Sequence, residues 1–188
     1  MTGTSAAENS AHILERMKRV RLLLLDVDGV LTDGGLYYGN TGEEMKRFHV
    51  RDGAGIAIAQ QAGIEVGLLT GKTSELVERR AADLGLTRVR QGALDKVPAL
   101  MEMLRDGAFP LNEVAYMGDD VLDLPVIRRV GLSACPADAH ELVRSRVHYV
   151  CAAPGGRGAV RELIDTILRA QGKMDGILAR FGEEEAHA

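Results

Sequence analysis

Short apolar runs alternate with longer amphipathic segments along most of this chain. The run at 20–27 is too short for a typical helix and is followed by Gly29, which is typical of a fully buried strand. Further strands are predicted at 64–69, 89–91 and 114–117. Helices are predicted at 10–18, 53–62, 73–84, 96–105 and 122–129. This alternation predicts an α/β fold, with right-handed crossovers and a doubly wound parallel sheet.

One segment departs from this alternation. Residues 36–38 are followed by the turn sequence GNTG and then by 43–50, where charged and larger residues alternate. This pattern predicts a β-hairpin at about 36–50 that projects from the sheet edge. We expect an N-terminal extension with a short helix at 1–19, a main domain at 20–172 and a C-terminal tail at 173–188.

Composition excludes several classes of protein. With 188 residues, 46% of them hydrophobic, the chain has the size and core of one domain. A formal net charge of −4 gives no general attraction to nucleic acid or anionic membranes. Two cysteines without CxxC spacing predict no disulfide framework or zinc site and fit a cytoplasmic protein. No apolar run approaches the ~20 residues that span a bilayer, and the acidic end GEEEAHA is predicted to be disordered.

Polar residues stand at or just beyond the ends of three of the predicted strands. They are Asp26 and Asp28, then Thr70, then Asp119 and Asp120. Ligands of open parallel sheets bind beyond the carboxyl ends of the strands, so the fold collects these residues at one edge. Carboxylates that meet there repel one another unless a cation lies between them, and oxygen ligands in small number suit Mg²⁺. The sequence therefore predicts a magnesium site suited to phosphoryl chemistry.

Each of these residues can be given a catalytic task. Asp26 can attack phosphorus and form an aspartyl-phosphate, while Asp28 can protonate the leaving alcohol and later deprotonate water. Thr70 can donate its hydroxyl and neighbouring N–H groups to phosphate, and Lys96 can supply a positive charge at a helix start.

Taken singly, each residue has a plainer interpretation. Asp26 and Asp28 can belong to a turn, Thr70 can cap a helix, and Asp119 with Asp120 can form a cap and an acidic first turn. Lys96 can be a solvated surface lysine. Their common order after successive strands favours the site.

Four stretches together resemble a known family. DVDGVLTDG, LLTGKTS, the lysine of GALDK and YMGDDVLDLPV resemble, in order, the four motifs of the haloacid dehalogenase superfamily of phosphatases, from about residue 20 to 172. GGLYYGNTGEEMKRFHVRDGAGI and PGGRGAVRELIDTILRAQGKMD are similar to the capless subgroup typified by 3-deoxy-D-manno-octulosonate 8-phosphate phosphatase. The resemblance implies a three-layer Rossmann-like fold without a cap domain.

The resemblance also implies an activity and its residues. The activity is Mg²⁺-dependent hydrolysis of 3-deoxy-D-manno-octulosonate 8-phosphate, a phosphorylated sugar acid, in lipopolysaccharide precursor synthesis. The metal would be held by Asp26, the main-chain carbonyl of Asp28, and Asp119. The implied substrate contacts are Asp28, His49, Val50, Arg51, Asp52, Gly53, Lys72, Arg80 and Lys96. Lys72 stands at a position where the subgroup commonly has arginine, and Ala57 stands where some members have arginine. Lysine keeps the positive charge but lacks the two parallel hydrogen bonds that an arginine can donate.

The spacing of the motifs leaves the site without a lid of its own. About forty residues separate Asp28 from Thr70, too few for a full cap domain besides the sheet elements. The resemblance implies a homotetramer whose neighbouring subunits close the site, with the 36–50 hairpin as the expected contact. The tail after Gln171 is a further candidate to reach a neighbouring site, with Arg157 holding an anion; alternatively, PGGRG only caps the last helix.

Two other functions stay open. One is a phosphatase for nine-carbon, sialic-type 9-phosphates on the same scaffold, although Arg51-Asp52-Gly53 favours the octulosonate. The other is a catalytically silent oligomerisation module. That module would have lost at least one of Asp26, Asp28, Lys96 or Asp119, and all four are present.

Overall fold

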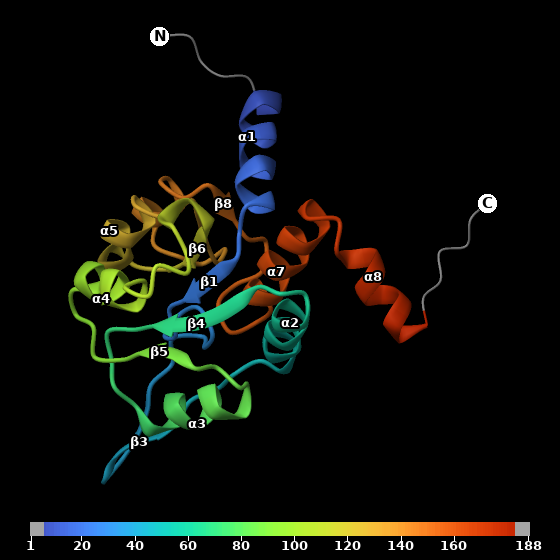
Figure 1. Cartoon of the computed structure of the whole chain (residues 1–188). Helices are drawn as coiled ribbons and strands as arrows, with labels where there is room; N and C mark the ends of the chain where they lie inside the picture. Colours follow the sequence, from blue (N-terminus) through green and yellow to red (C-terminus); the bar gives the residue numbers. More distant parts are fainter. Residues whose placement is uncertain (1–5, 183–188) are drawn as a thin grey trace.

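The central feature of the fold is a six-stranded parallel sheet with the order β5-β4-β1-β6-β7-β8. The structure is a computed structural model and describes residues 6–182 (Figure 1). The strands are β1 (Leu22–Leu25), β4 (Glu65–Leu69), β5 (Arg88–Arg90), β6 (Val114–Met117), β7 (Leu132–Cys135) and β8 (Tyr149–Val150). The predicted α/β fold with a doubly wound parallel sheet is confirmed.

Helices cover both faces of the sheet and make three layers. One face carries α1 (Ala6–Lys18), α2 (Val50–Gln61), α3 (Glu75–Asp83) and α7 (Ala159–Ala170), and the other carries α4 (Lys96–Met103), α5 (Leu124–Ile127) and α6 (Glu141–Arg144). The four leucines of β1 explain the apolar run at 20–27. Leu23 and Leu25 enter one core and Leu22 and Leu24 the other, because successive side chains of a strand point to opposite faces.

The structure differs from the sequence prediction in the second half of the main domain. β7, β8 and α6 have no predicted counterparts, and LSAC and YV are too short and too mixed in polarity to stand out as strands. α7 begins directly after PGGRG, as the capping interpretation of that stretch predicts. The helix predicted at 122–129 is a 3₁₀ turn, η2 (Val121–Asp123), followed by the short α5. Pro125 in the first turn of α5 suits this new helix start. A second 3₁₀ turn, η1 (Leu111–Glu113), precedes β6.

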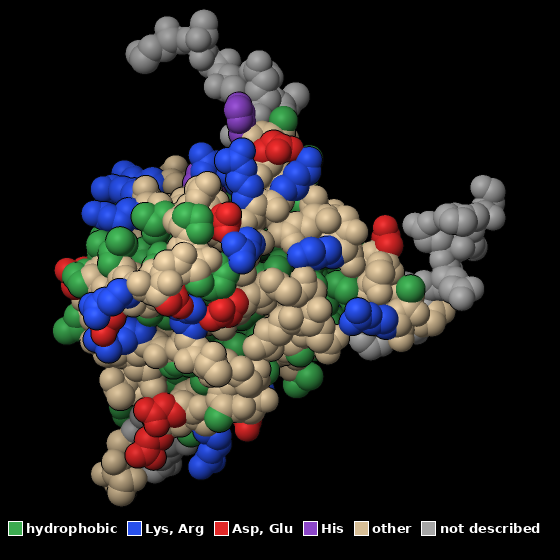
Figure 2. Space-filling view, in the orientation of Figure 1, with side chains coloured by type: hydrophobic (Ala, Val, Ile, Leu, Met, Phe, Trp, Pro, Cys, Tyr) green, Lys and Arg blue, Asp and Glu red, His purple; other side chains and the backbone are tan. Residues whose placement is uncertain are grey.

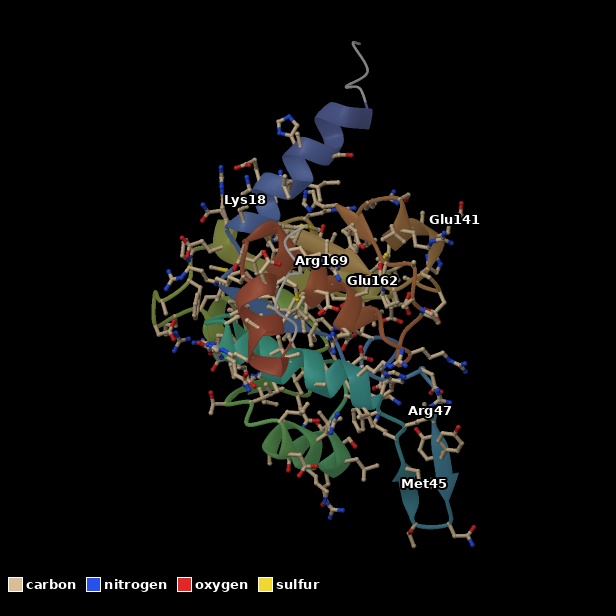
Figure 3. The ribbon with its side chains drawn as sticks, turned by 90° about the vertical axis from the view of Figure 1, so that its right-hand side faces the viewer. Lys18, Met45, Arg47, Glu141, Glu162 and Arg169 are labelled. Carbon is tan, nitrogen blue, oxygen red and sulfur yellow. The ribbon has the colours of Figure 1, made fainter. Side chains whose placement is uncertain are left out.

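The predicted hairpin is present and projects from the body of the molecule. β2 (Tyr37–Gly39) and β3 (Gly42–Met45) pair antiparallel, with a register irregularity between Tyr37 and Tyr38. Figure 3 shows the hairpin, with Met45 and Arg47 labelled, extending away from the helices. Within 6–182, the chain between Asp28 and Lys96 forms this hairpin, the strands β4 and β5 and the sheet-covering helices α2 and α3, so these residues hold no cap domain.

The segment predicted as a C-terminal tail begins with ordered structure. α8 (Met174–Leu178) is followed by η3 (Ala179–Phe181), and Met174 and Ile177 join the same core as α7. The acidic residues 183–188, predicted to be disordered, lie outside the described residues. The proposed domain boundaries stay predictions.

The described surface is mixed in character. On the face shown in Figure 2, acidic and basic side chains are interspersed with hydrophobic ones. Within 6–182, the helices are all too short or too polar to cross a membrane.

Candidate active site

The loops that follow the three central strands β4, β1 and β6 enclose a hollow of about 440 Å³. Seven of the residues predicted from the sequence line it: Asp26, Asp28, Thr70, Lys72, Lys96, Asp119 and Asp120. The three strands lie side by side in the sheet, so their carboxyl ends meet at one edge. Residues more than ninety positions apart in the chain are thereby brought to one place.

Asp26 is fixed at the bottom of this hollow by hydrogen bonds to both of its oxygens. Oδ1 accepts from the Val27 N–H at 2.7 Å, and Oδ2 accepts from Lys96 Nζ at 2.7 Å. The residue is 8% exposed. Burial raises the pKa of Asp26, and the positive charge of Lys96 opposes that rise. Asp26 is thus an oriented carboxylate with a cation at its side.

Lys96 is buried and paired with two carboxylates. It opens α4, whose N-cap Asp95 accepts a hydrogen bond from the Val97 N–H. Nζ lies 2.7 Å from Asp26 Oδ2 and 2.6 Å from Asp123 Oδ1. Burial alone would lower the pKa of Lys96, but the charges of Asp26 and Asp123 raise it above its ordinary value, so the ammonium stays charged. With 4% exposure, the interpretation of Lys96 as a solvated surface residue is wrong.

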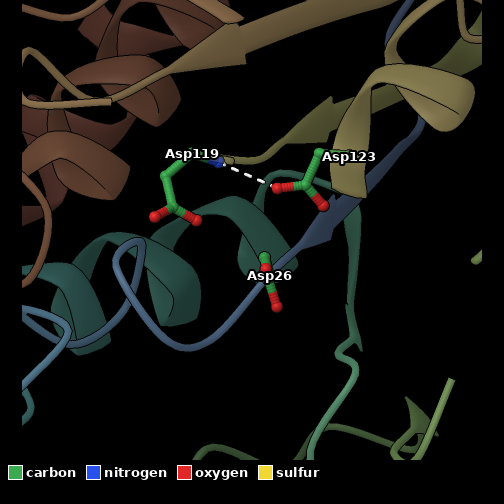
Figure 4. Close-up of side chains that lie close together, drawn as sticks. All are labelled: Asp26, Asp119 and Asp123. Atoms are coloured by element: carbon green, nitrogen blue, oxygen red, sulfur yellow. Dashed lines mark hydrogen bonds between the residues drawn. The ribbon is translucent and has the colours of Figure 1, made fainter. Parts of the chain in front are cut away.

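Asp123 organises the far side of the cluster and was not among the residues predicted from the sequence. Its Oδ1 accepts from Lys96 and, at 2.5 Å, from the buried hydroxyl of Tyr116. Its Oδ2 accepts from the N–H groups of Asp119, at 3.0 Å, and Asp120. The first of these backbone bonds is drawn in Figure 4. The sequence signal for Asp123 was the density of aspartates in YMGDDVLDLPV. Spacing alone does not distinguish a metal ligand from a residue that holds other side chains in place.

Asp26, Asp119 and Asp123 form an acidic cluster whose carboxylate oxygens lie within 4.8 Å of one another. Burial, and then the negative charges of Asp26 and Asp123, raise the pKa of Asp119 to about 8. Carboxylate oxygens are the ligands that Mg²⁺ prefers, and a divalent cation would relieve the repulsion that raises this pKa. Asp123 already accepts four hydrogen bonds, so Asp26 and Asp119 are the better donors to a metal.

The neighbouring acid, Asp120, has a different task. Its side chain accepts from the Val121 N–H at 2.6 Å and forms a capping box with Asp123 at the start of η2. The capping interpretation therefore holds for Asp120, while Asp119 belongs to the acidic cluster.

Asp28 is held by a residue that the sequence analysis missed. Lys46, just beyond β3 of the hairpin, donates from Nζ to Oδ1 of Asp28. The Asp28 side chain lies outside the acidic cluster, and the role of its main-chain carbonyl as a metal ligand stays a prediction. A lysine within alternating charged residues gives no sequence signal that distinguishes it from a solvated one.

Thr70 ends β4 inside the hollow and is 2% exposed. Its N–H donates to the Arg90 carbonyl and its carbonyl accepts from the Ala93 N–H, so the backbone is fixed from both sides. The next helix, α3, has Ser74 at its N-cap position, and Thr70 is therefore not a helix cap.

The loop that carries Asp28 depends on close backbone packing. Gly29 has φ +84° and lies against the Asp119 carboxylate, where a Cβ has no room. Gly155 of the PGGRG stretch packs directly on the carbonyl of Gly29, and the Gly156 N–H donates to the Val30 carbonyl at 2.9 Å. This stretch thus supports the Asp28 loop from behind. Arg157 is exposed and is not among the residues that line the hollow.

The remaining predicted substrate contacts do not line the hollow of this chain. Asp52 is 1% exposed and accepts from the N–H groups of Gly158 and Arg161 at the start of α7. Arg80 lies over the Phe48 ring, with Gly53 packed against it. Val50 is 83% exposed and Arg51 is exposed beside it, while the His49 side chain is one-third exposed. Their contact with substrate stays a prediction.

Known phosphatases are similar to this chain in sequence and in fold. No family model matches the chain. The sequence is 51% identical over 166 residues, 88% of each chain, to the 3-deoxy-D-manno-octulosonate 8-phosphate phosphatase of Escherichia coli strain K12. The crystal structure of the Yersinia pestis phosphatase of that name has a TM-score of 0.85 at 48% identity, covering 88% of this chain and 89% of that chain. The Moraxella catarrhalis structure, in complex with magnesium ion, phosphate ion and a KDO molecule, has a TM-score of 0.87 at 38% identity, covering 90% of this chain and 97% of that chain.

Proposed function

This chain belongs to the 3-deoxy-D-manno-octulosonate 8-phosphate phosphatases of the haloacid dehalogenase superfamily, and we propose that it hydrolyses that phosphomonoester to the sugar acid and phosphate. The observation that carries the proposal is the convergence of Asp26, Lys96 and Asp119 in one hollow beyond the central strands. A buried nucleophile, a fixed cation and a site for Mg²⁺ are the parts that phosphoryl transfer needs. A catalytically silent module would have lost at least one of Asp26, Asp28, Lys96 and Asp119. All four are present, which favours an enzyme.

Asp26 is the nucleophile in this proposal. One of its oxygens forms a bond to phosphorus as the ester P–O bond breaks, which leaves an aspartyl-phosphate and the sugar alkoxide. Hydrogen bonds from Val27 and Lys96 hold the carboxylate in one orientation, so little ordering is needed at the moment of attack.

Asp28 moves the proton in both half-reactions. It gives a proton to the leaving alkoxide, and it then takes one from the water whose oxygen attacks the aspartyl-phosphate. Phosphate leaves as the bond between phosphorus and the Asp26 oxygen breaks. Asp28 lines the hollow two residues beyond Asp26, as this exchange requires.

The remaining groups stabilise charge on the phosphoryl oxygens. Lys96 supplies a fixed positive charge, and Thr70 offers its hydroxyl at the end of β4. Mg²⁺ is held by the carboxylates of Asp26 and Asp119 with the main-chain carbonyl of Asp28, and it neutralises negative charge on the phosphate. Asp123 orients Lys96 and the Asp119 backbone.

The substrate is a phosphorylated sugar acid, which needs a cation beyond the phosphate site. Lys72 lines the hollow and can meet the carboxylate of the sugar. The stretch 49–53 and Arg80 remain candidate contacts to be tested by substitution. We propose that the free octulosonate serves lipopolysaccharide precursor synthesis in the cytoplasm, a compartment that the buried free thiols of Cys135 and Cys151 fit.

The test is Mg²⁺-dependent phosphate release from 3-deoxy-D-manno-octulosonate 8-phosphate, a nine-carbon sialic-type 9-phosphate and a hexose phosphate. Asp26→Asn keeps the shape of the side chain but removes the nucleophile, so we expect turnover to vanish. Asp33→Asn is the matched control, because Asp33 lies in the same loop and pairs with Arg47 instead. Preference for the nine-carbon ester would replace the substrate but keep the mechanism. If the wild type releases phosphate from none of the three esters, the proposed function is refuted.

A homotetramer is part of the proposal. The hairpin and the residue that opens α2 present Tyr37, Tyr38, Met45 and Val50 to solvent, with exposed fractions of 47%, 66%, 60% and 83%. Large apolar side chains gathered on a projecting element are typical of an interface between copies. We expect a tetramer by light scattering, and smaller species for Tyr38→Ser combined with Met45→Ser. A monomeric wild type would contradict it.

A test of whether the C-terminal tail reaches a neighbouring active site needs a truncation that spares the core. Ending the chain after Gln171 would also remove Met174 and Ile177, which are buried. Ending it after Gly182 keeps α8. Altered KM or kcat in that variant, with the assembly unchanged, would support a role for the tail; unchanged kinetics would end it.

A further inference from the structure

Lys46 is a buried lysine on the projecting hairpin segment, and its ammonium contacts the side chain of Asp28. We propose that Lys46 is a positioning residue that orients the Asp28 carboxylate for proton exchange with the substrate. The inference rests on the proposed function, since it gives Asp28 the acid/base role.

The burial of the pair distinguishes it from ordinary surface ion pairs. The Lys46 side chain is 0% exposed and that of Asp28 is 24% exposed. By contrast, Lys18 and Glu15 pair at 2.7 Å with side chains 46% and 56% exposed. Exposed pairs contribute little because water screens them, whereas a buried ammonium needs a partner to offset its lost hydration. The contact with Asp28 offsets part of that lost hydration.

The segment that carries Lys46 is fastened to the loop of Asp28 by a backbone bridge just after the contact. Thr32 and Phe48 form an isolated antiparallel bridge. The ion pair between Arg47 and Asp33 adds little, because the Arg47 side chain is 49% exposed and water screens the pair. Lys46 is not among the residues that line the hollow, whereas Asp28 is. The lysine therefore holds the carboxylate from outside the space that the substrate would occupy.

The geometry assigns the two oxygens of Asp28 different tasks. Oδ1 accepts from Lys46 and is thereby fixed. The other oxygen then has a defined direction, and through it a proton passes to the leaving group or from water. A carboxylate without this anchor would sample several rotamers, and small misplacements of a reacting group reduce rates by up to roughly a hundredfold.

Leaving-group dependence separates positioning from a general structural role. A sugar alkoxide needs a proton as it leaves, whereas p-nitrophenolate leaves without one. Formation of the aspartyl-phosphate is measured by rapid quench with both esters, in the wild type, Lys46→Met and Lys46→Arg. Arg47→Met is the control, because it removes the neighbouring cation and its ion pair with Asp33.

We expect Lys46→Met to slow aspartyl-phosphate formation from the sugar phosphate about ten- to a hundredfold, but from p-nitrophenyl phosphate by less than about threefold. Lys46→Arg should recover part of the loss and also covers the case in which Lys46→Met does not fold. Arg47→Met should match the wild type with both esters. Equal losses with the two esters, or no loss with either, would overturn the assignment while leaving the proposed function standing. A wild type inactive on every ester would overturn both.

Discussion

The hydroxyl of Tyr116 donates a 2.5 Å hydrogen bond to Asp123 Oδ1, the oxygen that also accepts from Lys96 at 2.6 Å. Tyr116 belongs to β6 and is 0% exposed, so this hydrogen bond is made entirely within the core. The lysine beside the nucleophile thus takes its position from a strand residue that does not line the hollow.

Tyr116→Phe should therefore affect stability and catalysis together. It leaves a buried carboxylate with one donor fewer, which costs about 1–3 kcal/mol in the free energy of unfolding. Because Lys96 is then the remaining donor to Asp123 Oδ1 and loses its own 3.1 Å hydrogen bond to the Tyr116 hydroxyl, we expect kcat to fall several-fold. Urea denaturation and steady-state kinetics measure both effects.

Tyr149→Phe is the matched control for that substitution. Tyr149 lies in β8, a different strand of the sheet, and its hydroxyl donates to Glu162 Oε1 at 2.9 Å. It should lose stability with kcat unchanged. A loss of kcat in Tyr149→Phe equal to that in Tyr116→Phe would show that the effect is not transmitted through Asp123.

Raising the pH should weaken the metal-free protein. The pKa of Asp119 is raised by burial and by Asp26 and Asp123 from its ordinary 3.8 to about 8. Between these values the folded state holds a proton that the unfolded chain has lost. The resulting stability is fully present below about pH 4 and is lost as the pH rises toward 8. In EDTA, the urea midpoint of the wild type should fall more steeply between about pH 6 and 8 than that of Asp119→Asn.

Added Mg²⁺ should reverse this trend. Metal ligands must be deprotonated, so the stabilisation by millimolar Mg²⁺ should be larger at pH 8 than at pH 6. Asp119→Asn should lose most of it at both values. The same response to Mg²⁺ in wild type and variant would exclude Asp119 as a ligand.

Gly155→Ala should impair catalysis although the residue lies outside the hollow. Its new Cβ would overlap the Gly29 carbonyl and push the Asp28 loop forward. We expect a loss of about 1–3 kcal/mol in stability and a clear fall in kcat. Gly176→Ala is the control, because nothing lies within 4 Å of its added Cβ and it sits in α8. It should stabilise slightly and keep kcat, whereas an unimpaired Gly155→Ala would argue against the support role.

Asp52→Ala tests whether Asp52 serves the fold or the substrate. Its two oxygens accept from the Gly158 and Arg161 N–H groups, so its loss should cost about 1–2 kcal/mol, as for other helix caps. Asp52→Asn should retain much of that stability. A rise in KM without loss of stability would instead support the substrate contact implied by the family resemblance.

The sequence revealed the parts of the site that depend on strand ends. Asp26, Thr70 and Asp119 each follow a short apolar run, and a parallel sheet has only one edge at which such runs can end together. Central strands could be predicted because burial on both faces makes them continuously apolar, as in β1. The edge strand β8 has two residues and offers no such run.

The residues that hold the catalytic side chains in place could not be predicted, because their roles depend on where their own side chains point in the fold. Tyr116 is indistinguishable in sequence from any core residue of a buried strand, and only the fold shows that its hydroxyl meets Asp123. Lys46 was missed for the same reason, since alternation assigns it to a face of the hairpin but not to a partner 18 residues earlier. The family resemblance implies a substrate contact for Asp52, whereas its contact with α7, over a hundred residues away, leaves no signal in the sequence.

The hairpin register has a consequence for how this protein can vary. Side chains alternate along a strand, so shifting β3 by one residue against β2 would turn Lys46 away from Asp28. Residues can be inserted into the turn between the two strands without this effect, because an insertion there leaves the pairing of β2 with β3 unchanged. Natural or engineered diversity should therefore accumulate as insertions at the tip of the hairpin, whereas single-residue insertions or deletions nearer its base should be counter-selected as loss-of-function changes.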